Sequence, residues 1–124
     1  MNIPNGHQAL MPYLIVNGAK QFIHFTQTVF NAKLTVSKMR EDEAVMMHCE
    51  IMINDCTIMF CDATPQWKAA TGNLFVYVPD ADITFQKAID AGAEVLMPLR
   101  NEDYGRTCGV TDPLGNVWWI TAVQ

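Results

Sequence analysis

The 124-residue chain has few charged side chains and no excess of basic ones. Only 17% of its residues are Asp, Glu, Lys or Arg, and 8 basic residues against 13 acidic ones give a net charge of −5. A protein that binds nucleic acid needs a basic stripe to neutralise the phosphates, so we expect no nucleic-acid partner. The acidic balance is compatible with a cationic small molecule.

Long hydrophobic runs are also lacking. Polar residues interrupt every apolar stretch well before the roughly 18 residues that a membrane-spanning helix requires. Residues 1–7 have neither the basic region nor the apolar core of a secretion signal. We therefore expect a cytoplasmic protein with no membrane partner. Because 50% of the residues are hydrophobic, the chain can form one domain over residues 1–124 with a single core.

The cysteines form none of the usual cysteine motifs. Cys49, Cys56, Cys61 and Cys108 include no Cys-x-x-Cys pair, and no histidine lies at zinc-finger spacing from them. The first three lie in apolar, strand-like segments, which predicts buried and reduced thiols. The chain also has no serine–histidine–acid order, no nucleotide-binding glycine loop and no Walker pattern.

An internal repeat is the most informative feature that is present. Residues 13–34 and 75–95 each read as strand, helix and strand, about 62 residues apart. Each half alone would be too small for an independent core, so we expect the two halves to share one. The pattern predicts module one at about 9–61, a linker at 62–72 and module two at about 73–123.

Hydrophobic periodicity predicts two helices and eight strands, which makes an α+β domain of two βαβββ modules. Asn31 suits the left-handed residue that ends the first helix, Asp80 can cap the start of the second, and Gly92 can end it. The helices are expected at 19–30 and 81–91, and the strands at 9–16, 33–39, 44–53, 56–61, 73–78, 94–98, 106–111 and 117–123.

The order of these elements, with the run 112–118 (DPLGNVW) before the last strand, resembles the vicinal oxygen chelate superfamily of glyoxalases, bleomycin-resistance proteins and ring-cleaving dioxygenases. The run 47–51 (MHCEI), the pair 54–55 (ND) and the turn 104–106 (YGR) are similar to its PhnB-like branch. The resemblance covers about residues 10–122. It implies two curved sheets around a cleft, a small-molecule ligand and a homodimer, in which residues 1–10 could reach across as an exchanged arm.

The resemblance also implies four positions at which catalytic members hold a divalent metal. In this chain these positions are occupied by Met11, Met59, Asn73 and Trp119. None of them supplies the imidazole or carboxylate that such a metal prefers. We therefore expect no metal and no other cofactor.

Strand alternation identifies the side chains that would face the cleft. On the strand at 44–53, Met47 is expected on the core face with Cys49 and Ile51, whereas His48 and Glu50 lie on the other face. The cleft would then be lined by methionine and aromatic side chains, which suit a planar or irregular organic ligand. The alternative is a closed core filled by the same side chains. The predicted ligand-binding residues are Tyr13, His48, Glu50, Met59, Asn73, Phe75, Tyr77, Arg106 and Trp119.

The role of the histidines stays open at the level of sequence. His48 and Glu50 could be a general acid–base pair, an anchor for a polar or cationic group, or a structural hydrogen bond. Arg106 could bind a carboxylate or phosphate or support a loop. His24 is expected in solvent, and His7 fits no pattern.

The favoured hypothesis is a metal-independent protein that binds an aromatic or hydrophobic small molecule, and the acidic charge also allows a cationic one. The alternatives are a glyoxalase-like enzyme with an atypical site and a subunit whose cleft is vestigial, so no catalytic residue is assigned and enzymatic activity stays undecided.

Overall fold

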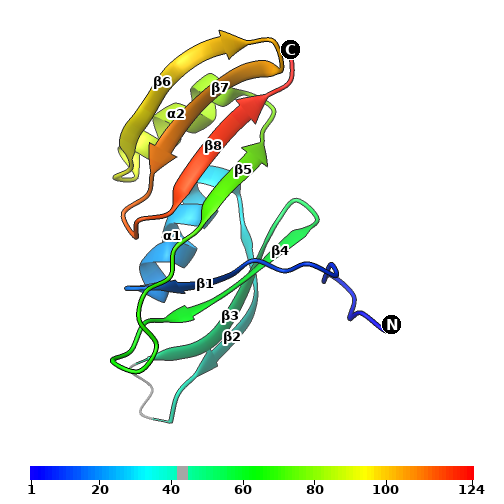
Figure 1. Cartoon of the computed structure of the whole chain (residues 1–124), viewed down its shortest axis with the longest axis vertical. Helices are drawn as coiled ribbons and strands as arrows, with labels where there is room; N and C mark the ends of the chain where they lie inside the picture. The colour runs from blue at the N-terminus through cyan, green and yellow to red at the C-terminus, as the bar shows by residue number, and fades with distance from the viewer. Residues whose placement is uncertain (42–44) are drawn as a thin grey trace.

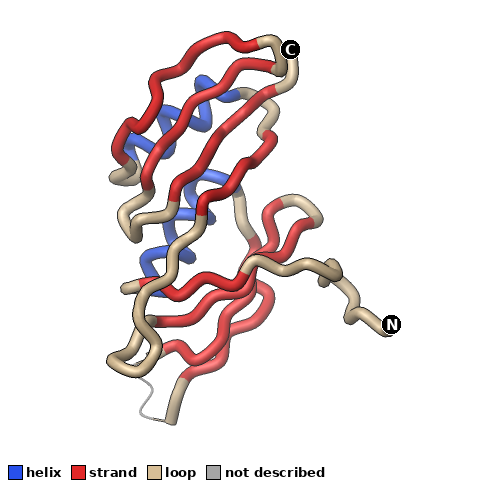
Figure 2. The backbone as a smooth tube through the Cα atoms, viewed as in Figure 1, coloured by secondary structure: helices blue, strands red, loops and turns tan. Residues whose placement is uncertain are grey.

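The computed structural model describes residues 1–41 and 45–124 as two four-stranded sheets with two helices (Figures 1 and 2). This confirms the predicted α+β class and the βαβββ order of each half. The elements are β1 (Tyr13–Val16), α1 (Ala19–Phe30), β2 (Lys33–Met39), β3 (Met46–Ile53), β4 (Cys56–Asp62), β5 (Asn73–Tyr77), α2 (Ala81–Asp90), β6 (Glu94–Glu102), β7 (Gly105–Thr111) and β8 (Val117–Ala122).

The two sheets have the same topology. Sheet A has the strand order β1-β4-β3-β2 and sheet B has the order β5-β8-β7-β6. In each sheet the first pair is parallel and the other two pairs are antiparallel. Helix α2 lies behind sheet B in the view of Figure 1, and α1 packs on β3 and β4 of sheet A, so each sheet carries one helix on one face among the described residues. We call the face of each sheet that points away from the helices its open face.

The predicted residues stand at the ends of both helices: Asn31 after α1 has a left-handed φ of 56°, and Gly92 shortly after α2 has a φ of 101°. The two helices begin in different ways. At the start of α2, the carboxylate of Asp80 accepts a hydrogen bond from the Ile83 N–H at 3.0 Å, as predicted. Helix α1 lacks a side-chain cap of its own, since Gly18 stands at its N-cap position. Asp62 at the end of β4 supplies the missing acceptor and binds the Ala19 N–H at 2.7 Å. The start of α1 is thus fastened to β4, the strand that pairs with β1.

One continuous hydrophobic cluster joins the two halves, as expected for a shared core. Trp118 of β8 is 1% exposed, and its ring lies 4.6 Å from that of Phe30 and 6.4 Å from that of Phe22, both on α1. The second half therefore packs its largest side chain onto the helix of the first half. Aromatic pairs at these distances add to the hydrophobic stabilisation of the packing.

The turn before β8 is organised by a single buried carboxylate. Asp112 is 4% exposed and accepts hydrogen bonds from the backbone N–H groups of Leu114 and Asn116, from the Asn116 amide and from the Trp118 indole N–H, all at 2.8–3.0 Å. Gly115 in this turn has a φ of 94°, which favours glycine. The run 112–118 that carries the family resemblance is therefore a structural device that orients Trp118 into the core.

Several local predictions were wrong. The first strand begins at Tyr13 rather than at residue 9, so Met11 precedes it, and β6 extends to Glu102. An irregularity in the pairing of β2 with β3 turns Met47 outward, where it is 44% exposed, and buries Met46 in its place. Residue 44, where the third strand was expected to begin, lies outside the described residues.

The cysteine prediction needs one correction. All four thiols are free and three of them are buried, but Cys56 is exposed because it directly follows the β3–β4 turn. Within the described residues, no helix is long and apolar enough to cross a membrane.

Candidate functional site

The open faces of the two sheets carry most of the predicted ligand-binding residues. On sheet A, Tyr13 pairs with Met59, and Met59 pairs with Glu50, so the three form one row across the strands. On sheet B, the corresponding row holds Phe75 and Trp119. Trp118 points to the opposite face, into the core, as strand alternation predicts.

Sheet A presents a connected polar cluster, which we call the Glu50 cluster: Tyr13, His48, Glu50 and His7. The Tyr13 hydroxyl lies 3.3 Å from Nδ1 of His48, and His48 Nε2 lies 2.8 Å from Oε2 of Glu50. The other carboxylate oxygen, Oε1, lies 2.6 Å from Nε2 of His7. The carboxylate thus binds one imidazole at each oxygen.

Electrostatics keep Glu50 ionised although the residue is only 7% exposed. Burial raises the pKa of its carboxyl, but the hydrogen bonds from His48 and His7, together with the positive charge of these imidazoles when they are protonated, outweigh that effect and hold the pKa below its usual range. A buried carboxylate with two imidazole partners is therefore a fixed acceptor rather than a proton donor.

The N-terminal segment brings His7 to this cluster. The Gly6 carbonyl accepts a hydrogen bond from the Thr57 hydroxyl, and the Gln8 side chain binds the Thr57 carbonyl at 2.9 Å and the Thr57 N–H at 3.3 Å. Thr57 is 2% exposed as a result. Residues 6–8 therefore cover part of the open face of sheet A. His7 could not be predicted as part of this cluster, because its partner is 43 residues away and no local sequence pattern links them.

Sheet B presents an aromatic surface instead. Trp119 lies flat over Gly109 of β7, where a Cβ atom would stand only 2.5 Å from its ring, and its indole N–H donates to Asn73 Oδ1 at 2.7 Å. Phe75 is 51% exposed, and its ring lies 5.2 Å from Tyr77 and 6.3 Å from Tyr104. Tyr104 was singled out in the sequence only as part of a turn, so its place in this aromatic group was missed.

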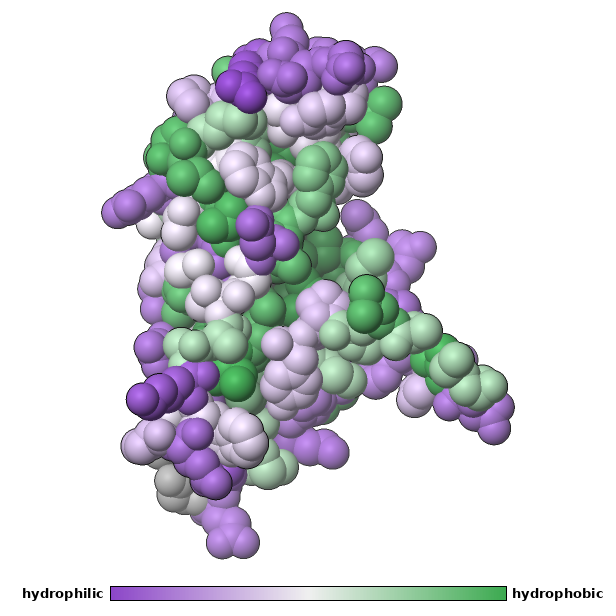
Figure 3. All heavy atoms as spheres, viewed as in Figure 1, coloured by the Kyte–Doolittle hydropathy of each residue, from purple (hydrophilic) through white to green (hydrophobic). Residues whose placement is uncertain are grey.

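An apolar groove of about 430 Å³ lies between β5 of sheet B and the N-terminal segment with the start of β4. Leu10 and Pro12 of the N-terminal segment, Ile58 of β4, and Phe75 and Tyr77 of β5 contribute to its walls. Figure 3 shows apolar side chains gathered in the hollow between sheet B and the N-terminal segment. Of the predicted ligand-binding residues, the lining of this groove includes Phe75 and Tyr77.

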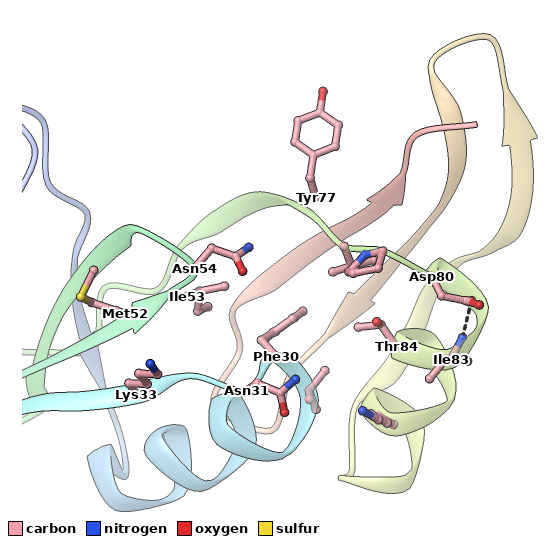
Figure 4. A pocket seen from close by; sticks show the side chains of 14 residues that line it. Phe30, Asn31, Lys33, Met52, Ile53, Asn54, Tyr77, Asp80, Ile83 and Thr84 are labelled. Atoms are coloured by element: carbon pink, nitrogen blue, oxygen red, sulfur yellow. Dashed lines mark hydrogen bonds between the residues drawn. The ribbon is translucent and has the colours of Figure 1, made fainter. Parts of the chain in front are cut away.

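A second cavity, of about 470 Å³, lies beside the β3–β4 turn and is more polar. It is lined by the end of α1, the start of α2 and residues such as Lys33 and Asn54. Figure 4 shows Tyr77 pointing away from the other side chains around it, and Asp80 is already used as the cap of α2. The predicted residues therefore converge on the open faces and not on this cavity.

Arg106 does not join the predicted site. Its side chain donates to Asp82 of α2 at 2.9 Å and also contacts Asn101. It thus lies on the helix side of sheet B, because residues 106 and 108 share a face and Cys108 is buried in the core. His24 is exposed on α1, as predicted.

The metal positions implied by the family resemblance do not fit a metal. The Met11 sulfur accepts the Gln8 N–H at 3.4 Å, and the Asn73 oxygen is occupied by the Trp119 indole. Thioether, indole and a single amide oxygen make a poor donor set for a divalent ion. Across residues 1–41 and 45–124, no group of three or more His, Cys, Asp or Glu side chains is placed to hold one.

Comparison with known proteins places these features in a family. The model of the Glyoxalase/Bleomycin resistance protein/Dioxygenase superfamily matches residues 6–120. An uncharacterized protein of Mycobacterium bovis is 31% identical over 92% of this chain and 82% of its own length.

Two solved structures share the fold at low sequence identity. A PhnB protein from Bacillus cereus has a TM-score of 0.77 at 18% identity and covers 94% of this chain and 100% of its own. TnmS3, described as an antibiotic binding protein from Streptomyces sp. CB03234, has a TM-score of 0.72 at 17% identity, with 95% and 100% covered. The fold, the repeat and the family model agree: the chain belongs to the glyoxalase/bleomycin resistance protein/dioxygenase superfamily.

Proposed function

We propose that this protein binds an aromatic or hydrophobic small molecule without a metal ion. The observation that carries the proposal is the seating of Trp119 over Gly109, with its indole N–H fixed by Asn73 and exposed Phe75 and Tyr77 nearby. A flat, oriented indole beside further exposed aromatic rings offers a large stacking surface at little entropic cost.

The proposal includes a homodimer. In a single chain, sheets A and B lie one beyond the other along the long axis of the molecule rather than face to face (Figure 1). A second copy could bring its sheet A against sheet B of the first. The exposed apolar side chains near the groove, such as Leu10 at 86% and Tyr77 at 59%, fit burial in such an interface.

Two further observations support the proposed ligand and a cytoplasmic location, which we also propose. TnmS3, which has the same fold, is described as an antibiotic binding protein, so this fold is compatible with an organic ligand. The four free cysteines of the chain fit a reducing compartment such as the cytoplasm.

An enzymatic function is the second candidate, and the Glu50 cluster is the observation that favours it. His48 is partly exposed and has a carboxylate behind it, which is the arrangement of a general base. The binding function is preferred because the predicted residues include no second group, such as a nucleophile or a metal, that would define a reaction.

The test combines binding and mass. Purified protein is titrated with 2-naphthol and other planar aromatics while tryptophan emission is recorded, and its mass is measured by light scattering at micromolar concentration. Saturable binding at one site per chain and a mass near twice 13.9 kDa are expected. A monomer that binds no compound of a broad aromatic and cationic panel would contradict the proposal and favour a vestigial cleft.

A further inference from the structure

The hydrogen bonds of the Glu50 cluster determine where the proton of His48 resides. A carboxylate only accepts hydrogen bonds, so the contact of 2.8 Å between His48 Nε2 and Glu50 Oε2 requires a proton on Nε2. A neutral imidazole carries one N–H, and therefore its Nδ1 is an acceptor. The Tyr13 hydroxyl, 3.3 Å away, is the group that donates to it.

The Tyr13 hydroxyl, at the outer end of this chain of hydrogen bonds, therefore offers an acceptor to a ligand. Burial raises the pKa of Tyr13, so that side chain is a neutral phenol. Once its proton points to His48, the phenol oxygen has only lone pairs to offer. A ligand that displaces the hydroxyl meets the His48 Nδ1 lone pair instead. In both arrangements the polar end of the open face is a hydrogen-bond acceptor.

The N-terminal segment holds the inner end of the chain. His7 occupies the second oxygen of Glu50 at 2.6 Å, and the contacts of Gly6 and Gln8 with Thr57 keep it there. A carboxylate bound at one oxygen only could rotate or accept water. Bound at both oxygens it has one orientation, and His48 has one tautomer.

We propose that His7 is a positioning residue that holds Glu50, fixes the Nε2–H tautomer of His48 and makes the polar end of the site select ligands that carry a hydroxyl, phenol or N–H donor. The selection of ligands rests on the proposed binding function. The role of His7 in fixing the tautomer does not rest on it.

The tautomer is tested first, by two-bond ¹H–¹⁵N NMR correlation on the neutral limb of a pH titration. The chain has only three histidines, and His24→Ala identifies the solvent-exposed one and serves as the control. Wild-type His48 is expected as the Nε2–H form. His7→Ala should produce a mixture of both forms, and His7→Gln should restore the wild-type pattern because its amide can still donate to Glu50.

A wild-type His48 protonated on Nδ1, or a His7→Ala protein with an unchanged His48 tautomer, would overturn the role of His7. Circular dichroism is used to check that each variant compared is folded. Failure of His7→Gln to restore the pattern would also count against positioning through a hydrogen bond.

The selection of ligands that carry a donor is tested with 2-naphthol and 2-methoxynaphthalene. The first has a hydroxyl that can donate a hydrogen bond, and the second has a methoxy group that cannot. One neutral hydrogen bond corresponds to roughly a threefold to tenfold change in affinity, so wild-type protein should prefer 2-naphthol by that factor. The preference should shrink in His7→Ala and vanish in the double variant Tyr13→Phe/His48→Phe, which removes both acceptors and keeps a ring at each position. Equal affinities in the wild-type protein would overturn the selection. Binding of neither compound would overturn the selection together with the proposed function, and the NMR result would still judge His7.

Discussion

Adding one methyl group at Gly109 should displace Trp119. A Cβ atom at this position would lie 2.5 Å from Cζ3 and 2.7 Å from Cε3 of the indole, closer than non-bonded carbon atoms approach. The indole cannot yield without breaking its 2.7 Å hydrogen bond to Asn73, which is worth about 1 kcal/mol. Overpacking of this kind lowers the free energy of unfolding by roughly 1–3 kcal/mol. Replacing a glycine within a strand by alanine raises it by about 0.5–1 kcal/mol.

We therefore expect Gly109→Ala to lower the free energy of unfolding by about 1–2 kcal/mol and to weaken aromatic ligands. Urea denaturation gives the stability, and near-ultraviolet circular dichroism reports the altered indole. The double mutant with Trp119→Ala is the decisive control, because the cost of the added methyl should nearly disappear once the ring is gone. A Gly109→Ala protein with wild-type stability and an unchanged tryptophan spectrum would refute this account of the aromatic surface.

Three other predictions concern single residues. Trp119→Ala should remove about 1 kcal/mol of stacking beyond the lost contact area, so its affinity for 2-naphthol should fall in a calorimetric titration. Trp67→Ala, on the exposed linker, should leave that affinity unchanged. Equal losses of affinity in the two variants would show that the ligand binds elsewhere. Asp112→Ala should cost several kcal/mol in urea denaturation because it leaves buried donors, including the Trp118 indole, without their acceptor; a cost below about 1 kcal/mol would contradict the role of that carboxylate. Because the folded-state pKa of Glu50 is lowered, its contribution to stability is present above the unfolded pKa of about 4.3 and is lost as the pH falls through the folded pKa. Glu50→Gln should then flatten the loss of stability in acid, and an unchanged acid limb would show that the cluster contributes nothing there.

The helices and most strands followed from periodicity because their apolar faces pack locally against one core. The residues 22, 23, 26, 29 and 30 that repeat at helical spacing are all buried in α1, together with Ala19 and Phe25. The alternation of β8 gave opposite faces to Trp118 and Trp119, and the structure has them so. These are predictions within one element, where sequence distance and spatial distance agree.

The errors arose where a strand departs from strict alternation or where contacts join distant segments. The irregularity opposite Lys38 and Met39 exchanges the environments of Met46 and Met47, and a period of two cannot anticipate it. The burial of Glu50 depends on residues 6–8, which lie more than forty positions earlier in the chain. Arg106 is a different kind of error, because its spacing from Cys108 already placed it on the core face.

The equivalent rows of the two sheets explain how one repeated backbone presents two unlike surfaces. The register aligns Tyr13, Met59 and Glu50 of sheet A with Phe75, Trp119 and Gly109 of sheet B. At the third place of the row, sheet A has a long carboxylate that gathers two imidazoles. Sheet B has no side chain there, and the indole from the neighbouring strand occupies the space.

The difference at this one position has consequences for the whole row. A side chain at residue 109 would displace the indole, and loss of the carboxylate at residue 50 would leave His7 and His48 without a common acceptor. Sheet A therefore presents a carboxylate with two imidazoles, and sheet B presents a flat aromatic surface. If two copies set these faces against each other, the complementary ligand is a planar ring that carries a hydrogen-bond donor at one edge. The proposed homodimer and the proposed ligand class thus depend on the same pair of positions, and Gly109→Ala and Glu50→Gln should impair binding through different halves of the site.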